Sequence, residues 1–490
     1  MMLGRIGARR ARLNYDGARS ERHESWRRAV GGSNEVVAQD GPALAARAQD
    51  LQRNDANAAI ILAKLRDSLT GIVPRAATDD PALNADIDAI WDEWAREAST
   101  ETYQTIYGLQ ALAIESWKRD GNVLGRFRVR QARDGLTVPL QIQLLPDQFI
   151  ARHLNGPLPN GNRVISGVEV DPLGRPAAYH LFEEDPKGQY ATGRVVRVPE
   201  VAVFHLHEVQ YAGQRLGVSV LSPVMVALRD MQLYRESIHT RAGAEAALMA
   251  FVTSESDPDA TITNSGKTTS DGSPVEEMVP GTVARLGPGQ DVKFNAPQAS
   301  SGFGEVSTLA KQEIYTAGGL TYEAGGDLSR VNWTSFRAGQ LDSRRAVRYA
   351  QSELIIPLFM RRVWVQFIDA AIAAGLLPEA ARSKERRLLT GRVLVQGYPV
   401  RWRLPPFMEV DGEKQAKSSQ ALLRAGLAVH EVEIEATTGL SMAEYIAAEK
   451  RYHDACVAAG LRFDSDPTAS SGNGQAQAAP AVAPDPTAAP

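Results

Sequence analysis

The sequence predicts an α+β chain in which a mainly helical base carries a β-rich insertion. Apolar residues recur at three- and four-residue spacings in the first and last thirds of the chain, which is typical of amphipathic helices. Between residues 122 and 210 the apolar period changes to two, which indicates strands. Two further helices are expected on either side of residues 253–302, which are rich in Ser, Thr, Gly and Pro.

Composition excludes several classes of protein. The 490 residues, about three domains in length, include 54 Lys and Arg against 58 Asp and Glu, a net charge of −4 that is unlike a generally basic nucleic-acid coat. The single Cys456 cannot form an intrachain disulfide. The longest apolar run, 370–378, is too short to span a bilayer, so we expect no membrane segment, and the first residues lack the apolar stretch of a secretory signal.

Helix signals begin after Pro42. Three helices are expected before residue 120, the last over about 99–119. Asp80 before Pro81 is an N-cap followed by proline at the first helical position, which opens a segment containing Trp91 on its apolar face. The chain therefore begins its fold as a packed helical scaffold.

The insertion shows strand signals. Residues 140–144 alternate between apolar side chains and glutamines. A strand over 164–170 is expected to pair with one over 177–182 across the turn 171–174, and 201–206 adds another strand.

A long helix is expected from Ser222 and Pro223, as N-cap and first residue, to about residue 250, followed by a helix over 305–317. The glycine-rich residues 318–335 come next, and then a helical stretch to about residue 374 that Pro357 kinks or breaks. Ser441 and Glu444 form a capping box for the last helix, which ends near residue 459.

No catalytic motif stands out. Gly266, Lys267 and Thr268 resemble the end of a phosphate-binding loop, but Thr261 replaces the glycine that such a loop needs. His205 and His207 share one face of a strand. Packing is the simpler interpretation of this pair, and a metal site is the more specific alternative. We expect no enzyme activity, no cofactor and no metal.

A basic strip is the remaining candidate site. Arg337, Arg344 and Arg348 lie at i, i+7 and i+11 of a predicted helix, and Arg330 precedes them in the glycine-rich loop. This strip is either a solvated helix face with internal ion pairs or a surface that faces nucleic acid. Glycines in the loop, at Gly318, Gly319, Gly325 and Gly326, are expected to let it change shape.

Several segments, in this order, resemble the lambda-like family of tailed-bacteriophage portal proteins. They are N-Y-D-G-A-R from Asn14 with Trp26 downstream, R-A-Q-D-L-Q-R-N over 47–54, G-V-E-V-D-P-L-G-R-P-A-A-Y-H over 167–180, F-H-L-H-E-V-Q-Y-A-G-Q-R-L-G-V-S over 204–219, N-W-T-S-F-R over 332–337, and the glycine-punctuated end from A-L-L-R-A-G-L to T-T-G-L-S-M-A-E. Together they extend over about residues 14–455. The chain departs from the family at 69–74 and 405–412, where the usual glycine-rich helix end and Trp-rich stretch are altered.

The resemblance implies a portal fold assembled as a ring, commonly of twelve subunits. The implied parts are a disordered basic arm (1–35), a wing of helices with a β insertion (36–218), a stem helix (219–250), a small α/β clip (251–302), a second stem helix (303–317), a tunnel loop (318–335), a kinked helix returning to the wing (336–408), a crown (409–462) and a disordered Ala/Pro-rich tail (463–490). The first 30 residues carry eight Arg and three acids, which is consistent with such an arm.

The resemblance also implies partners and place. Double-stranded DNA would pass through the ring, and the terminase large subunit, head-completion or neck proteins, and major capsid and scaffold proteins would bind it. The implied place is the portal vertex of the virion, with the host cytoplasm during assembly, and the implied roles are head assembly, genome packaging, head–tail joining and DNA ejection. Two alternatives stay open: another head-assembly component, such as a head–tail adaptor or minor capsid protein, and a metal-dependent hydrolase built on His205 and His207.

Overall fold

The protein is described by a computed structural model. It describes residues 32–189, 191–246, 250–254, 290–294, 303–325, 333–378, 386–387, 393–394, 399–406, 412–440 and 442–461. Nearly all of the expected arm (1–35), all of the expected tail (463–490) and most of 251–302 lie outside these residues, as do Arg330, Gly326, Ser441 and the Gly266 segment.

Helices form most of the described chain. They are α1 (Ser33–Asn54), α2 (Ala56–Leu69), α3 (Pro81–Trp94), α4 (Ile106–Asp120), α5 (Met225–Ala246), α6 (Phe303–Ala317), α7 (Trp333–Tyr349), α8 (Arg361–Ala373), α9 (Gly412–Arg424), α10 (His430–Thr438) and α11 (Met442–Ala459). The π-helix η7 (Ala350–Met360) joins α7 to α8, and short 3-10 helices are η3 (Ala132–Asp134), η4 (Asp147–Phe149), η5 (Glu200–Ala202) and η6 (Glu323–Gly325). In the described part of the chain no helix combines the length and apolarity needed to cross a membrane.

Strands form antiparallel sheets, so the mixed helix-and-strand class is confirmed. One sheet has the order β3 (Leu140–Pro146), β2 (Asn122–Val129), β9 (Val203–His207), and another runs β4 (Gly156–Pro157), β5 (Arg163–Ile165), β6 (Val168–Val170), β7 (Pro176–Phe182), β8 (Val195–Pro199). Three strand pairs complete the set: β1 (Val73–Ala76) with β14 (Val400–Arg403), β10 (Ala250–Ser254) with β11 (Gln290–Phe294), and β12 (Arg386–Arg387) with β13 (Val393–Leu394).

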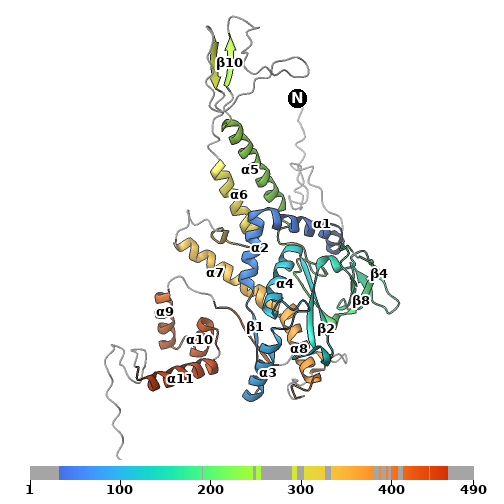
Figure 1. Ribbon diagram of the computed structural model, residues 1–490, viewed down its shortest axis with the longest axis vertical. Coiled ribbons are helices and arrows are strands. Elements are labelled where there is room, and N and C mark those ends of the chain that lie inside the picture. The colour runs from blue at the N-terminus through green and yellow to red at the C-terminus, as the bar shows by residue number, and fades with distance from the viewer. Residues whose placement is uncertain are drawn as a thin grey trace, which may run out of the picture.

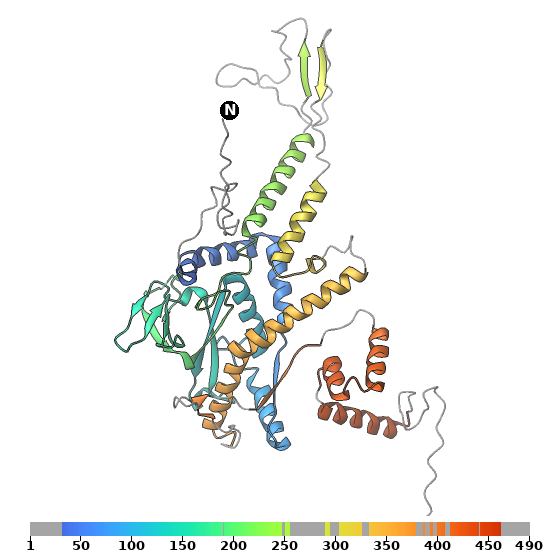
Figure 2. The same cartoon turned by 180° about the vertical axis from the view of Figure 1, so that it is seen from behind.

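The elements give the subunit an extended shape. Helices α5 and α6 rise side by side from a base that includes α1 and α2, and the β10–β11 pair lies beyond their far ends (Figure 1). Both views place α9, α10 and α11 to one side of this base, where β14 leads toward them (Figure 2). Arg401 and Arg403 of β14 form ion pairs with Glu431 and Glu444 of these helices.

The largest core joins segments far apart in the sequence. Trp91 of α3 lies 5.2 Å from Trp364 and 5.0 Å from Phe367 of α8, measured between ring centroids. Trp94 lies 5.1 Å from Phe367, and its indole N–H donates to the carbonyl of Leu140 at 2.8 Å. These fully buried aromatic side chains therefore fix α8 against both α3 and β3.

A second core fixes the base of the paired helices. It contains Leu228 and Met231 of α5, Ile314 of α6, and Ile61 and Leu62 of α2, all buried. A third core lies between the β3–β2–β9 sheet and the β4–β8 sheet. The β insertion is therefore packed onto the helical base through its own apolar interface.

Local signals confirmed some boundaries. Asp80 caps α3, since its carboxylate accepts from the Ala82 amide at 2.9 Å, and Pro81 is the first helical residue as expected. The turn after β6 is also confirmed: Asp171 accepts from the Leu173 amide at 3.0 Å, and Gly174 has a φ of 80°.

The expected strand over 164–170 was wrong in one respect. It is a hairpin of β5 and β6, broken by Ser166 and Gly167, whose φ values are 49° and 81°. Two consecutive positive φ angles are what a tight two-residue hairpin turn requires. This turn was not predicted from the sequence, because the apolar alternation before it indicates one continuous strand and because Ser166 is not a usual residue at a positive φ.

Three expected helix starts and one end were also wrong. Helix α4, expected from about residue 99, begins at Ile106. Helix α1 begins at Ser33 and contains Pro42, whereas the sequence placed the helical start after Pro42. Helix α5 begins at Met225 rather than at Ser222 and Pro223, and it ends at Ala246, after which residues 250–254 form β10. Pro357 does not break the chain's helix: it lies within η7, which runs on without a gap into α8.

Arg152 contacts α1 next to Pro42. Proline lacks the amide hydrogen that would bond to the carbonyl of Ala38, four residues earlier in the helix. The guanidinium of Arg152 donates to the carbonyl of Val37 at 3.1 Å and also pairs with Asp147. A Cβ on Gly41 would come within 2.3 Å of that guanidinium, so a larger residue there would displace the end of the Arg152 side chain. A side chain from the β insertion thus bonds to the backbone of the proline-containing helix.

Glu169 of β6 forms a buried anion site within the β4–β8 sheet. Its side chain is fully buried, accepts two bonds from Arg197 at 2.6 and 2.9 Å, and accepts another from Asn162 at 2.6 Å. These bonds, first of all those from Arg197, lower the pKa of Glu169 from 4.5 to about 2.

We predict that Glu169→Gln lowers the stability of the subunit at neutral pH by about 1–2 kcal/mol, because a charge-assisted pair is removed. A lowered pKa stabilises the fold above pH 4.5, and this contribution disappears as the pH falls toward 2. Thermal unfolding midpoints of the wild type and the variant should therefore differ at pH 7 and converge at low pH. A difference that is constant across this range would contradict the role of the charge.

Candidate functional site

The paired helices α5 and α6 meet α2 through polar contacts at their base. The Tyr315 hydroxyl donates to the side-chain oxygen of Asn57 at 3.1 Å. The side-chain amide nitrogen of Asn57 lies 3.9 Å from the sulfur of Met231. The Asp55 carboxylate caps α2 by accepting from the backbone amide of Asn57 at 2.9 Å. One asparagine therefore links α2, α5 and α6. Sequence reasoning missed this link, because Asn57 and Tyr315 are 258 residues apart and neither lies in a local motif.

The glycine-rich segment after α6 packs closely where it is described. Gly318 is buried, and a Cβ there would lie 3.0 Å from Ile61. A Cβ on Gly325 would lie 2.3 Å from the Tyr315 ring, whereas Gly319 has a φ of 87°. Gly318 and Gly325 thus permit close approach to neighbouring side chains. Their expected contribution to loop movement stays a prediction.

Three of the four candidate arginines lie on α7. Arg337 is exposed, and Arg344 and Arg348 are half-buried. Burial lowers the pKa of Arg348. A Cβ on Gly339 of the same helix would lie 3.4 Å from Thr321, so α7 runs beside the segment that follows α6. The structure therefore brings the basic helix and part of the glycine-rich segment together, while Arg330 lies outside the described residues.

The two strand histidines are part of the packing between sheets. The rings of His205 and His207 stack 4.0 Å apart, and His205 Nε2 lies 3.1 Å from the side-chain oxygen of Asn122. Burial lowers the pKa of His207 to about 4 and that of His205 well below its ordinary value. Glu208 pairs with Lys118 at 3.1 Å instead of facing the imidazoles.

A metal role for these histidines has no further ligand to support it. Among the described residues, no three His, Cys, Asp or Glu side chains gather where they could hold a metal ion. The oxygen beside His205 is an amide, and the Asn122 amide nitrogen is committed to Asp147 at 2.8 Å. The arrangement favours the packing interpretation.

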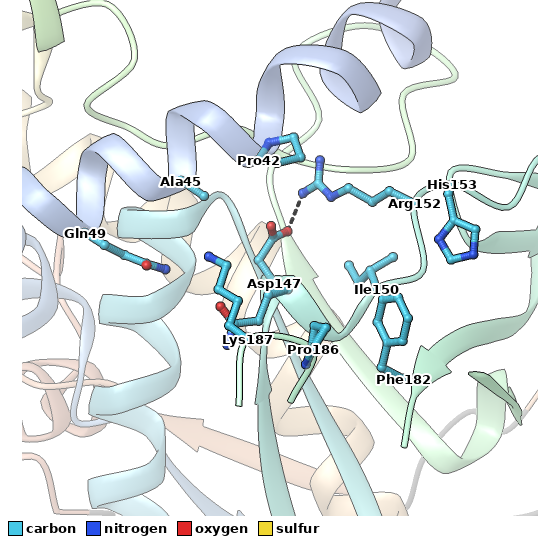
Figure 3. Close-up of a pocket in the computed structure, with 11 residues that line it drawn as sticks. Pro42, Ala45, Gln49, Asp147, Ile150, Arg152, His153, Phe182, Pro186 and Lys187 are labelled. Atoms are coloured by element: carbon cyan, nitrogen blue, oxygen red, sulfur yellow. Dashed lines mark hydrogen bonds and ion pairs between the residues drawn. The ribbon is translucent and has the colours of Figure 1, made fainter. Parts of the chain in front are cut away.

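A cavity of about 300 Å³ lies between α1 and the β insertion. Figure 3 shows Pro42, Ala45 and Gln49 on α1, with Arg152 beside Pro42 and with Asp147 and Lys187 lower in the view. Apolar walls come from Ile150, Phe182 and Pro186. Because Arg152 is committed to Asp147 and to the Val37 carbonyl, the charged pair in this cavity holds α1 in place.

Comparison with known proteins gives a family match over most of the chain. A family model described as phage portal protein, lambda family, matches residues 19–351. A probable portal protein of Halomonas phage phiHAP-1 is 25% identical over 406 residues, which cover 77% of this chain and 74% of that protein.

Solved structures give more remote similarities. A chain from the virion of a native gene transfer agent particle has a TM-score of 0.43 and 14% identity, covering 84% of this chain and 99% of that one. A chain from the neck of the native particle, computed with C12 symmetry, has the same TM-score and identity and covers 83% and 94%. An HK97 family phage portal protein from Corynebacterium diphtheriae has a TM-score of 0.31 and 11% identity, covering 74% and 94%.

We predict that Gly325→Ala destabilises the subunit by about 1–3 kcal/mol, because the added methyl group meets the Tyr315 ring. Chemical denaturation would measure the decrease. Gly304→Ala is the matched control: nothing lies within 4 Å of its Cβ position in α6, so stability should be unchanged or slightly higher. Equal effects of the two substitutions would show that Gly325 is not needed for close packing.

Proposed function

Because the chain belongs to the lambda family of phage portal proteins, we propose that its copies form a ring, with twelve subunits, around a channel for double-stranded DNA. This ring occupies one vertex of the capsid. It takes part in head assembly, in genome packaging by a docked terminase, in head–tail joining and in DNA ejection.

The apolar surface of the paired helices carries the ring proposal. Their bases are buried, but Val226 and Leu233 of α5 are 72% and 45% exposed and Leu309 of α6 is 65% exposed in the single subunit. Apolar side chains of this size along a projecting helix pair favour association, since their transfer from water is favourable. Neighbouring copies supply the missing cover, with an interface above about 1,000 Å².

The parts of the chain take the following places in this ring. The proposed stem is 219–250 with 303–317, the clip is 251–302, the tunnel loop is 318–335, the wing is 36–218 with the return segment 336–408, and the crown is 409–462. The order of the described elements supports this division, because α5, β10, β11 and α6 follow one another as a helix, a strand pair and a second helix.

The charge of the chain suits a conduit. Twelve copies with a formal charge of −4 each carry roughly −48 in total, which repels DNA overall. Each phosphate that a protein neutralises adds affinity that a sliding duplex must break. A few arginines, which we assign to Arg330, Arg337, Arg344 and Arg348, then guide DNA without holding it.

The remaining partners follow from this place in the virion. The terminase large subunit and later the neck proteins bind the clip, and the major capsid and scaffold proteins bind the ring during assembly in the host cytoplasm. The chain itself consumes no nucleotide in this scheme, because the terminase supplies the energy for packaging.

We predict that Leu309→Glu, alone or with Val226→Glu, prevents ring formation, because it places charges in an apolar contact between copies. Negative-stain images and light scattering of the purified full chain would measure assembly. Leu173→Glu is the matched control, since Leu173 is 74% exposed in a turn of the β insertion and should leave rings intact. Rings that form normally with Glu at 309 and 226 would contradict the proposed stem interface.

We predict that replacing Arg337, Arg344 and Arg348 with Glu lowers DNA packaging or retention while rings still form. The reversed charges repel phosphates where the wild type attracts them. Packaged DNA per particle is the readout. Replacing Arg47, Arg53 and Arg96 with Glu changes the charge equally at exposed positions outside α7 and is the matched control. Failure of the triple variant to assemble would instead identify these residues as interface ion pairs.

A further inference from the structure

Three arginines alternate along β2 and its immediate continuation, outside the basic helix considered above. Arg126, Arg128 and Arg130 occupy positions i, i+2 and i+4, so they project from one face at intervals of roughly 7 Å. Phe127 points to the opposite face and joins the largest core. The alternation therefore anchors the strand on one side and leaves a row of half-buried guanidinium groups on the other.

Amide side chains, rather than carboxylates, hold two of these three arginines. Arg128 donates through Nε and Nη2 to the side-chain oxygen of Gln143 at 2.9 and 2.6 Å. Arg130 donates through Nε to Gln141 at 2.8 Å. Gln141 is buried and is itself fixed, because its amide donates to the carbonyls of Glu97 and Ser99 at 3.1 and 2.9 Å. These contacts orient the guanidinium groups without neutralising them.

Two acids of the neighbouring segments bond to backbone amides. Glu97 accepts from the Thr137 amide at 2.5 Å, and Asp134 accepts from the Gln131 amide at 3.1 Å. Within the described residues none of the three arginines forms an ion pair with an acid. Burial, together with neighbouring Arg126 and Arg130, lowers the pKa of Arg128, as expected for adjacent like charges.

We propose that the row Arg126, Arg128 and Arg130 binds the phosphate backbone of double-stranded DNA, independently of base sequence. Arg130 donates to its amide partner through Nε, which leaves its terminal nitrogens to face phosphate oxygens, and Arg128, which also uses Nη2, keeps Nη1 for this. Three cations at even spacing, with no acid between them, match a polyanion that carries a charge on every repeat. An acidic protein segment, with its mixed and irregular side chains, fits this row less well.

This row is separate from the proposed channel arginines and does not depend on them. It lies on β2 and its continuation in the β insertion, whereas Arg337, Arg344 and Arg348 lie on α7. Failure of this inference would leave ring formation and the channel untouched. Failure of the ring proposal would likewise leave DNA binding by this row measurable.

The test measures binding of the full chain to a fluorescent mixed-sequence duplex by anisotropy, as a function of salt. Replacing all three arginines with Gln should weaken binding about tenfold or more and reduce the slope of log affinity against log salt by about 3, one for each phosphate that is no longer neutralised. Replacing them with Lys should keep most of the slope, because the charges remain.

The matched control removes three exposed arginines elsewhere. Replacing Arg47, Arg53 and Arg96 with Gln changes the net charge equally and should leave the salt slope unchanged. An unchanged slope in the variant with Gln at 126, 128 and 130, or an equal decrease in the control, would overturn the proposal. The proposal would also be overturned if the wild type bound polyglutamate more tightly than duplex and lost that binding when residues 126, 128 and 130 are Gln. That result would indicate an acidic protein partner. If the variant with three Gln residues does not fold, a variant with Arg126→Gln, Arg128→Lys and Arg130→Lys replaces it in the same salt measurement.

Discussion

The packing of α8 against α3 is the contact on which the rest of the structure depends. Between Trp91 and Trp364 the chain builds the β insertion, rises along α5, returns along α6 and turns back through α7. The aromatic cluster closes this excursion, since Trp91, Trp94, Trp364 and Phe367 are fully buried against one another. Burying aromatic side chains of this size offsets part of the entropy that such a long closed loop costs.

Short-range chemistry made part of the fold predictable. Asp80 and Pro81 fixed the start of α3, and Asp171 with Gly174 fixed the turn after β6, because each signal lies within a few residues of the structure that it makes. The long-range arrangement was not predictable in this way. Pro42 suggested a helical boundary, yet α1 contains it and is contacted there by Arg152, 110 residues later in the chain.

The candidate site was predictable to a similar depth. Helical spacing correctly grouped Arg337, Arg344 and Arg348, since all three lie on α7. The role of Gly325 could not be predicted from composition. A glycine-rich segment has the same composition whether its glycines allow movement or let a tyrosine ring approach the backbone. The alternation Arg-Phe-Arg-Val-Arg from residue 126 was visible in the sequence, but its significance needed the partners Gln141 and Gln143 and the commitment of Glu97.

The π-helix η7 sets the angular phase between helices α7 and α8. Its hydrogen bonds span one residue more than those of an α-helix, so its turns hold more residues. The segment stands directly between the arginines of α7 and the aromatic residues of α8. A deletion or insertion of a single residue there would rotate the arginines of α7 about the helix axis relative to the aromatic residues that α8 buries.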